Sequence, residues 1–294
     1  MKAFSFTAPT TIKEMNKILA DVATPGEIHP IVGGTDLIEQ VKTGRRAPSI
    51  VMDIKHIPEM NRLEWVSGEG LHLGAAVSCT DTAAFPLVQE SYESIKESCG
   101  LIGSVQIQNR ASIVGNIANS APSADSVPSA LVHEASVVLV SPSGTRTIPL
   151  EDFFTGPGKN VSEPNEVVLE IILPPPPDNS SSHYLRFIPR NEMDIAVAGV
   201  ASLLALAPDS LTCTKARIAL ASVGPTPVRA KAAETFLEGK DLTNELIEKA
   251  AELAVESASP ITDVRGSIEY RNDLVKVLTE NTLRMCLRSL NQNL

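Results

Sequence analysis

Four consecutive prolines, Pro174 to Pro177, constrain the fold of this 294-residue chain more than any other feature. Proline fixes φ and has no amide hydrogen, so this segment cannot continue a helix or lie in the middle of a sheet. The polar stretch from Asp178 to Ser182 that follows is typical of a flexible linker. We therefore expect two domains, residues 1–175 and 176–294, although a long surface loop within one domain would show the same pattern.

The region before the prolines divides into two units by its hydrophobic pattern. Residues 1–56 predict a small βαβ-like unit, with helices at 11–21 and 35–42 and strands at 29–34 and 48–54. Residues 57–175 predict a larger unit of short strands with one helix at 85–98; the strands are expected at 63–68, 70–78, 135–150 and 165–174. The fold class is therefore α+β.

The region after the prolines changes from strand patterns to helix patterns. Strands are predicted at 182–190, 197–208 and 213–224, and helices at 227–239, 243–258 and 267–290. In the middle helix the apolar residues recur at the helical period, which indicates core packing. We expect a three-stranded antiparallel sheet with a helix bundle.

Composition excludes several classes of protein. The net charge of −10, from 25 basic and 35 acidic residues, argues against a nucleic-acid partner, and an aromatic content of 4% argues against stacking on single strands. No apolar run approaches the ~18–20 residues that span a bilayer, and the first thirty residues lack a secretory signal, so we expect a cytoplasmic protein. Neither the spacing of the four cysteines nor that of the five histidines resembles a metal-ligand set, so we expect no metal site and buried, inert thiols.

Two stretches of low bulk point to a common ligand. In the first, Gly33 and Gly34 tolerate positive φ and let the backbone approach a ligand. Asp36 is placed to cap the next helix with Glu39 as its reciprocal partner, and a helix start suits a pyrophosphate. Asp36 could be a helix cap alone and need not contact the ligand. The stretch matches neither G-x-G-x-x-G nor the P-loop pattern.

The second stretch, residues 103–125, echoes the first. Ile113-Val114-Gly115-Asn116 repeats the pattern of Ile31-Val32-Gly33-Gly34, and almost only small residues follow it. Such a segment can bring its backbone close to phosphates or to a large flat group, and its Asn and Ser side chains can donate hydrogen bonds. The two stretches together favour a phosphate-containing ligand.

These motifs, with VMDIKHIPEMNRL, LHLGAAVSCTD and SPITDVRGSIEYR, make the chain closely resemble the FAD-binding medium subunit of the molybdenum hydroxylases. This family includes xanthine dehydrogenase and carbon monoxide dehydrogenase. The resemblance covers nearly the whole chain. It implies a two-part FAD-binding domain of the PCMH or vanillyl-alcohol-oxidase type (1–56 and 57–175) and a C-terminal flavoprotein domain (176–294).

The resemblance also implies cofactor-binding positions. The first loop would wrap the FAD pyrophosphate, the second would form its other wall, and further residues would contact the polar middle and the flavin end: Pro30, Ile31, Val32, Gly33, Gly34, Thr35, Asp36, Leu37; Ser112, Ile113, Val114, Gly115, Asn116; Ile102, Asp125, Leu169 and Arg186. Asp125 would hydrogen-bond the polar middle, or could instead cap the following helix. Arg265 and Arg271 are expected to form buried ion pairs between C-terminal helices.

One position departs from the family pattern. The family commonly has two glycines where this chain has Val114-Gly115. Valine has less backbone freedom than glycine, so the second loop could adopt a different conformation.

The function that the resemblance implies is electron transfer within a complex. A large molybdopterin-binding subunit would oxidise the substrate, a small subunit would carry two 2Fe–2S clusters, and the FAD of this chain would pass electrons to an external acceptor, in a dimer of heterotrimers. No catalytic acid or base is expected in this chain. Two alternatives remain: a self-sufficient FAD-dependent oxidase, often with a histidine tether to flavin, and a scaffold subunit that has lost FAD.

Overall fold

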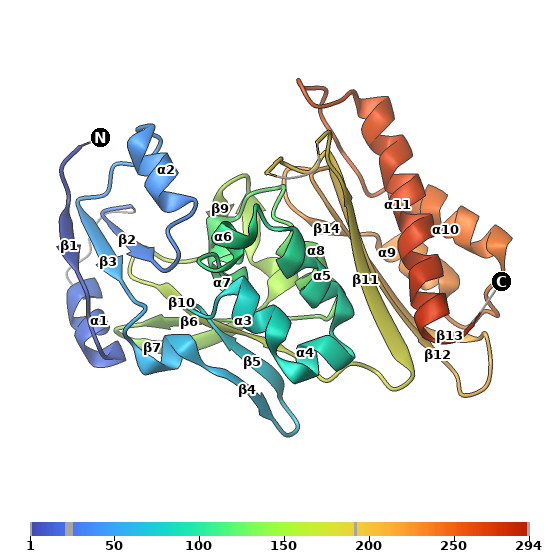
Figure 1. The fold of residues 1–294 in the computed structure, drawn as a ribbon, viewed down its shortest axis with the longest axis horizontal. Helices are drawn as coiled ribbons and strands as arrows, with labels where there is room; N and C mark the ends of the chain where they lie inside the picture. Colours follow the sequence, from blue (N-terminus) through green and yellow to red (C-terminus); the bar gives the residue numbers. More distant parts are fainter. Residues whose placement is uncertain (1, 21–25, 191–192, 293–294) are drawn as a thin grey trace.

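The computed structural model describes residues 2–20, 26–190 and 193–292. Figure 1 shows three parts side by side along the long axis: a small N-terminal unit, a central unit and a C-terminal sheet covered by helices. The mixture of helices with separate sheets confirms the α+β class.

The N-terminal unit is a three-stranded sheet with two helices. Its strands β1 (Ser5–Thr7), β2 (Ile28–Ile31) and β3 (Ile50–Asp53) lie in the order β1-β3-β2, and both pairings are parallel. Helix α1 spans Ile12–Leu19 and α2 spans Leu37–Lys42. The predicted βαβ unit is thus β2-α2-β3. Strand β1 is additional, and the last residue predicted for the first helix, residue 21, lies outside the described residues.

The central unit is built on a five-stranded antiparallel sheet in the order β4-β5-β10-β6-β7. Its strands are β4 (Leu63–Val66), β5 (Gly70–Gly74), β6 (Ser136–Ser141), β7 (Gly144–Pro149) and β10 (Val167–Leu173). A small hairpin, β8 (Phe154–Gly156) and β9 (Lys159–Asn160), lies between β7 and β10 in the chain. Two 3₁₀ turns, Pro58–Asn61 and Leu150–Asp152, complete the connections.

Six short helices belong to the central unit: α3 (Cys79–Ala84), α4 (Pro86–Ser91), α5 (Glu93–Leu101), α6 (Val105–Gln108), α7 (Ile113–Asn119) and α8 (Ser126–Val132). The single helix predicted at 85–98 is therefore wrong, because Tyr92 breaks it with φ −132° and ψ 53°. Tyr92 is fully buried, and its hydroxyl donates to the Pro174 carbonyl at 2.9 Å. This tertiary contact outweighs the local preference for one continuous helix.

The C-terminal part is an antiparallel sheet in the order β11-β12-β13-β14 with three helices on it. The bounds are β11 (Ser180–Phe187), β12 (Ala198–Leu206), β13 (Cys213–Ala221), β14 (Val228–Arg229), α9 (Lys231–Leu237), α10 (Asn244–Val255) and α11 (Ile268–Ser289). The three predicted strands are present, and the two-residue β14 adds a fourth. It takes residues predicted as the start of a helix, because Val228 and Arg229 pair with β13.

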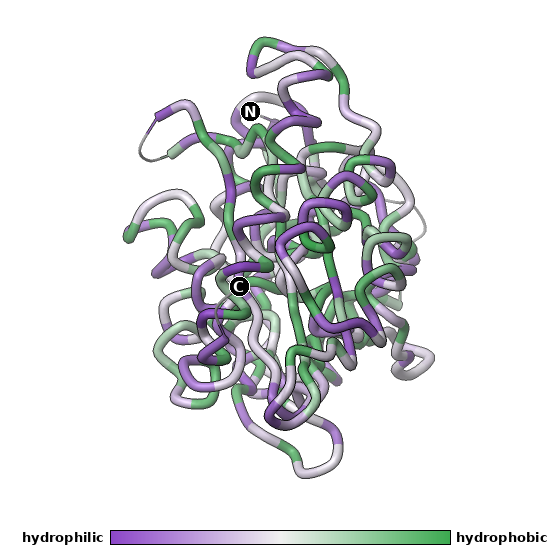
Figure 2. The backbone as a smooth tube through the Cα atoms, turned by 90° about the vertical axis from the view of Figure 1, so that its right-hand side faces the viewer, coloured by the Kyte–Doolittle hydropathy of each residue, from purple (hydrophilic) through white to green (hydrophobic). Residues whose placement is uncertain are grey.

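The C-terminal sheet is buried on both faces. One hydrophobic core joins the N-terminal and central units and extends to Tyr184, Ala201, Leu203 and Ala219 of this sheet, while a second core lies between the sheet and α9–α11. All nine residues of β12 are buried. Figure 2 shows green hydrophobic segments running through the body of the molecule, while its outer turns carry purple, white and green residues.

The segment after the prolines is not a flexible linker. Ser180 to Ser182 begin β11, and the Ser182 hydroxyl lies 3.0 Å from Nε2 of the buried His133. The first core includes residues on both sides of the four prolines, so it does not separate the two expected domains. The division of the chain into domains 1–175 and 176–294 stays a prediction. Within the described residues, no helix combines the length and the apolar composition needed to cross a membrane.

Candidate FAD-binding cleft

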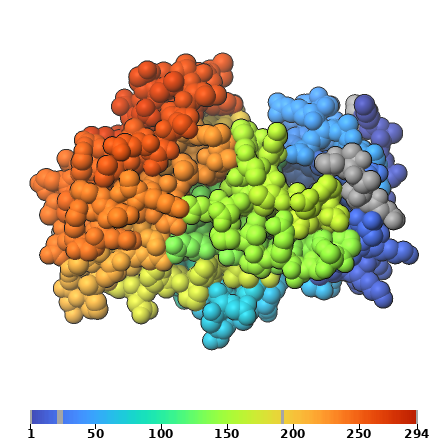
Figure 3. Space-filling model, turned by 180° about the vertical axis from the view of Figure 1, so that it is seen from behind, coloured from blue at the N-terminus to red at the C-terminus, as the bar shows by residue number. Residues whose placement is uncertain are grey.

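A cleft of about 990 Å³ lies where the N-terminal unit, the central helices and β11 meet. All of the cofactor-binding residues predicted from the resemblance line it, except Ile113 and Leu169. Figure 3 shows from behind how the blue N-terminal unit adjoins the green middle of the chain. The two low-bulk stretches therefore lie in one cavity, although Gly33 and Gly115 are about 80 positions apart in the sequence.

The two stretches contact each other directly. A Cβ placed on Gly33 would lie 1.9 Å from the Arg110 carbonyl oxygen, and one on Gly115 would lie 3.3 Å from Cγ2 of Val32. Gly33 is thus required for the close approach of two backbones. Gly34 has φ +72°, so its role is conformational.

Residues 113–119 of the second stretch form helix α7 rather than a glycine-type loop. The Ser112 hydroxyl caps this helix by accepting from the Gly115 amide at 2.9 Å. Val114 is the second residue of the helix and is 1% exposed. Helical φ and ψ are open to valine, so the departure from the family pattern does not distort this segment.

Two predicted residues contribute through the core rather than through the cleft wall. The Ile113 side chain is fully buried in the first core. Leu169 lies on β10, and its carbonyl accepts from the Ala75 amide at 2.9 Å. Both residues support segments that line the cleft.

Asp36 occupies the residue before α2 but does not cap it. Its side chain makes no cap hydrogen bond, and its φ of −92° and ψ of −48° are helical rather than extended. The predicted reciprocal cap with Glu39 is therefore wrong, because a cap residue needs an extended backbone to turn its side chain back to the helix amides. Desolvation within the cleft raises the pKa of the Asp36 carboxyl, although the residue remains partly open to solvent.

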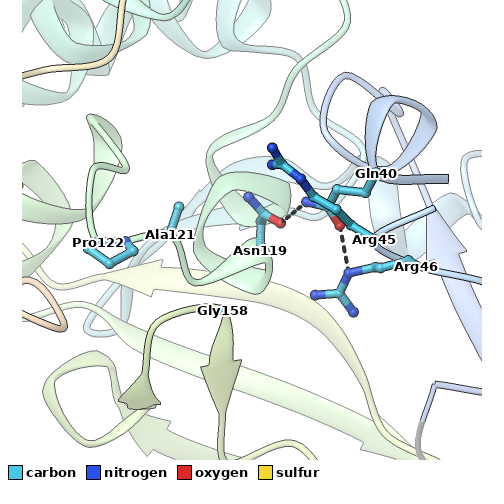
Figure 4. Close-up of a pocket in the computed structure, with 7 residues that line it drawn as sticks. All are labelled: Gln40, Arg45, Arg46, Asn119, Ala121, Pro122 and Gly158. Atoms are coloured by element: carbon cyan, nitrogen blue, oxygen red, sulfur yellow. Dashed lines mark hydrogen bonds between the residues drawn. The ribbon is translucent and has the colours of Figure 1, made fainter. Parts of the chain in front are cut away.

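Hydrogen bonds between side chains hold the segments at the outer end of the cleft together, and the sequence pattern did not predict these residues. Gln40 donates to Asn119 Oδ1 at 2.9 Å, which joins α2 to the end of α7, and Arg46 donates to Gln40 Oε1 at 2.6 Å (Figure 4). Arg46 also bonds Nε2 of His29 at 2.8 Å. Burial and the nearby Arg46 charge lower the pKa of His29. The Arg45-Arg46 pair after Gly44 was the available sequence signal.

These residues also border a smaller pocket of about 390 Å³ next to the cleft. Its lining is shown in Figure 4 and consists of Gln40, Arg45, Arg46, Asn119, Ala121, Pro122 and Gly158.

At the other end, Asp125 meets two residues of β11. Its carboxylate accepts from the Tyr184 hydroxyl at 2.7 Å and from Arg186 Nη1 at 2.5 Å. The alternative that Asp125 caps α8 is excluded, because its side chain makes no cap bond there. Burial raises the pKa of Asp125 and the Arg186 charge counteracts this, while burial and the neighbouring carboxylate raise the pKa of Tyr184.

Arg186 has an unused donor. Its side chain is 4% exposed, and Nε is buried without a hydrogen-bond partner among the described residues. An unmatched buried donor costs about 1–3 kcal/mol, so a ligand acceptor at this point would be stabilising.

The cleft fits FAD. Its volume is at the upper end of the ~300–1,000 Å³ range of ligand sites, which suits a large cofactor. Glycine backbone is exposed at its centre, and the orphaned Nε of Arg186 supplies a donor.

The described residues contain no group of three or more His, Cys, Asp or Glu side chains that could hold a metal ion. All four cysteines are free and buried, as predicted. Arg271 is also buried as predicted and pairs with Asp263 at 2.7 Å, but it bonds the Val197 and Ser222 carbonyls rather than another helix. The neighbouring Arg265 is one-third exposed, so its predicted burial is wrong; its 3.7 Å pair with Asp263 lies at the surface.

Comparison with known proteins identifies two regions of the chain. Residues 2–176 match the FAD binding domain in molybdopterin dehydrogenase, and residues 183–286 match the CO dehydrogenase flavoprotein C-terminal domain. The carbon monoxide dehydrogenase medium chain of Hydrogenophaga pseudoflava is 30% identical and aligns over 95% of this chain and 96% of its own. The nicotinate dehydrogenase FAD-subunit of Eubacterium barkeri is also 30% identical, over 94% and 93%.

Solved structures agree with the sequence comparison. The carbon monoxide dehydrogenase structure from Hydrogenophaga pseudoflava superposes with a TM-score of 0.91 at 30% identity and covers 98% of both chains. Quinoline 2-oxidoreductase from Pseudomonas putida 86 gives a TM-score of 0.90 at 26% identity over 99% of both chains. The chain therefore belongs to the family of FAD-binding medium subunits of the molybdenum hydroxylases, and the resemblance seen in the sequence is confirmed.

Proposed function

We propose that this chain carries FAD as the electron-transfer subunit of a molybdopterin-dependent hydroxylase or dehydrogenase complex. The observation that carries the proposal is the contact of the two low-bulk stretches at Gly33 and Arg110 within one cleft of about 990 Å³. Family membership supplies the cofactor type, and the electrons would come from partner subunits.

The expected partners are a large molybdopterin-binding subunit and a small subunit with 2Fe–2S clusters, in a dimer of heterotrimers. FAD would supply the redox chemistry, since it can accept electrons singly and release them as a pair. The chain itself would bind and orient it. The bare backbone at Gly33 and Gly34 would face the pyrophosphate, and Arg186 would donate to the cofactor at the other end of the cleft. A cytoplasmic location is part of the proposal.

The cleft also bears on the alternative of a self-sufficient oxidase. Of the histidines, His29 lines the cleft, and its Nδ1 is buried without a hydrogen-bond partner among the described residues. Such an oxidase often tethers its flavin covalently to histidine. Flavin that remains on the chain after denaturation would favour this second function.

The test is purification of the tagged chain from a host that also carries its neighbouring genes. We expect a yellow protein with two flavin absorption bands, FAD released by denaturation, and companion subunits with molybdenum and iron measurable by elemental analysis. Colourless protein that takes up no added FAD would contradict the proposal, and yellow protein that turns over substrate alone would support the oxidase.

A variant tests the assigned loop. Gly34→Glu should lose FAD, because the new side chain adds a negative charge beside the phosphates and Gly34 has φ +72°. Unchanged FAD content in this variant would contradict the placement of the pyrophosphate.

A further inference from the structure

The smaller pocket beside the cleft is lined by charges of one sign. Arg45 and Arg46 border it, and its lining includes no Asp or Glu (Figure 4). Neither arginine forms an ion pair within the part of the chain that the structure describes, whereas Arg217 and Arg229 each pair with a glutamate. The chain as a whole has a net charge of −10, so this pocket is a cationic site in an acidic protein.

The hydrogen bonds at this pocket fix the direction of its side-chain amides. A guanidinium can only donate, so the atom of Gln40 that meets Arg46 Nε at 2.6 Å is the acceptor Oε1. The Gln40 amide nitrogen then donates to Asn119 Oδ1 at 2.9 Å. Both amide oxygens thus accept a bond within the protein. The Asn119 amide nitrogen remains as a donor that no described residue accepts from.

The unused donors can be reached from solvent. Arg46 uses Nε for Gln40 and Nη1 for His29, which leaves Nη2 without a hydrogen bond to any described residue. Arg46 Nη2 and Asn119 Nδ2 are both absent from the buried polar atoms that lack a partner, so neither is sealed inside the protein. Arg45 is exposed and adds a second guanidinium to the rim. The pocket therefore offers a ligand several donors and two positive charges.

These arginines are not needed to complete α2. Basic side chains often follow a helix because they can bond its last, unpaired carbonyls. Here the carbonyls of Glu39, Gln40 and Val41 already accept from backbone amides further along the chain. The guanidinium groups are therefore available for another acceptor.

The pocket is distinct from the loops assigned to the FAD pyrophosphate. It shares its arginines with the outer end of the cleft, but no residue from 30 to 37 or from 112 to 116 lines it. FAD contains a single pyrophosphate, so its phosphates cannot occupy both places. The volume of about 390 Å³ is far above the ~30 Å³ that one water takes in the liquid, so the pocket has room for a phosphate and for part of the molecule that carries it.

We propose that this pocket binds the phosphate group of a second small molecule, next to FAD and separate from it. Arg45 and Arg46 supply charge-assisted donors to the phosphate oxygens, and Asn119 supplies a neutral one. Guanidinium groups suit this role, because their fork of donors matches the spacing of phosphate oxygens. Inorganic phosphate and the phosphate monoester of a nucleotide present the same chemistry, and the experiment below distinguishes them.

The test measures binding to the FAD-loaded protein, together with any subunits that accompany it. The probes are inorganic phosphate and the pair NAD⁺ and NADP⁺, which differ by one phosphate monoester. Calorimetric titration at low ionic strength gives the Kd of each probe for the wild type and for Arg45→Gln, Arg46→Gln and Arg288→Gln. The last variant is the control, since Arg288 is an exposed arginine of α11 that does not line the pocket.

We expect the wild type to bind phosphate, with a Kd that rises as salt is added. Arg45→Gln should raise this Kd about threefold to tenfold and Arg46→Gln about tenfold or more, because each removes a charged donor. Arg288→Gln should leave it unchanged. Arg45 makes no hydrogen bond to a described residue, so its variant decides the matter if Arg46→Gln, which breaks the bonds to Gln40 and His29, fails to fold.

The two dinucleotides identify the source of the phosphate. Tighter binding of NADP⁺ than of NAD⁺, with the difference lost in Arg45→Gln, would support the inference and identify a nucleotide monoester. Binding of inorganic phosphate with equal Kd values for the two dinucleotides would support it and identify the free anion.

Three results would overturn the inference. One is the absence of phosphate and NADP⁺ binding by the wild type. Another is a Kd in Arg45→Gln and Arg46→Gln that equals that of the wild type or of Arg288→Gln. The third is binding of phosphate to FAD-free protein alone, with FAD as its competitor, which would make the pocket a part of the cofactor site. Absence of FAD from the wild-type protein would instead contradict the proposed function, and the phosphate Kd values of the variants would still decide this inference.

Discussion

The backbone of Gly33 packs against the carbonyl oxygen of Arg110, at a distance where a Cβ would lie 1.9 Å from that oxygen. One residue belongs to the N-terminal unit and the other to the segment before α7. This contact joins the two halves of the cleft wall.

Gly33→Ala should therefore separate the two segments. A methyl group at 1.9 Å from a backbone atom cannot be accommodated without moving one chain, so we expect a loss of about 1–3 kcal/mol in the free energy of unfolding and a loss of bound FAD. Denaturant titration and flavin absorbance measure the two effects. The control is Gly100→Ala in α5, where a Cβ meets no atom within 4 Å; it should be neutral or stabilising by up to about 1 kcal/mol. Equal behaviour of the two variants would show that the close contact is unimportant.

Asp36→Ala should change stability little, because Asp36 does not cap α2. We expect the free energy of unfolding to stay within about 0.5 kcal/mol of wild type. Thr243→Ala is the comparison, since the Thr243 hydroxyl does cap α10 by accepting from the Leu246 amide, and its removal should cost about 1 kcal/mol. A comparable loss in Asp36→Ala would show that Asp36 caps α2 after all.

Val114→Gly tests whether valine weakens the second stretch. Val114 is 1% exposed and helical, so the glycine variant should lose about 2–4 kcal/mol of stability without binding FAD more tightly. Val105→Gly makes the same change at an exposed position in α6 and should cost no more than about 1 kcal/mol. Tighter FAD binding by Val114→Gly would support the alternative of a subunit that is losing its cofactor.

His133 should make the protein less stable in mild acid. Burial lowers its pKa from 6.5 to about 3, so the ring stays neutral in the folded state while the unfolded chain is protonated below pH 6.5. The stability contributed by the neutral ring is complete above pH 6.5 and is lost progressively as the pH falls towards 3. Between pH 6.5 and 5 the loss is about 2 kcal/mol.

Denaturant titrations at pH 7, 6 and 5 measure this effect. His133→Gln should reduce the pH dependence and leave the contribution of His29, whose pKa burial and the Arg46 charge also lower. Glu134 titrates below this interval, because the Lys215 and Arg217 side chains lower its pKa to about 2 although burial opposes them. Desolvation raises the pKa of Asp36 and of Asp125, so these two carboxyls change the stability in the opposite direction as the pH falls. The same slope in His133→Gln would show that this ring is not the source.

The elements with a clear local pattern could be predicted from the sequence. β2, α2 and β3 follow from apolar periodicity and from the glycines between them, and the long α11 from its helical period. Elements that depend on distant partners were missed. β14 exists because it pairs with β13, and the break at Tyr92 exists because its hydroxyl reaches Pro174.

The candidate site shows the same division. The residues of both low-bulk stretches were predicted, because glycine and small side chains leave a visible local signature. Gln40, Arg46 and Tyr184 were not, since a glutamine, an arginine or a tyrosine has no pattern of its own until folding places it beside Asn119, His29 or Asp125.

The sequence by itself determined the α+β class, the two bare segments and the family, because these depend on local conformational preference and on residues in a fixed order. The tertiary structure alone decided that Gly33 touches Arg110 and that the Asp125 carboxylate accepts hydrogen bonds from Tyr184 and Arg186. Such contacts join residues about 60–80 positions apart, and their geometry is set by the packing of whole elements, which no single stretch of the chain encodes.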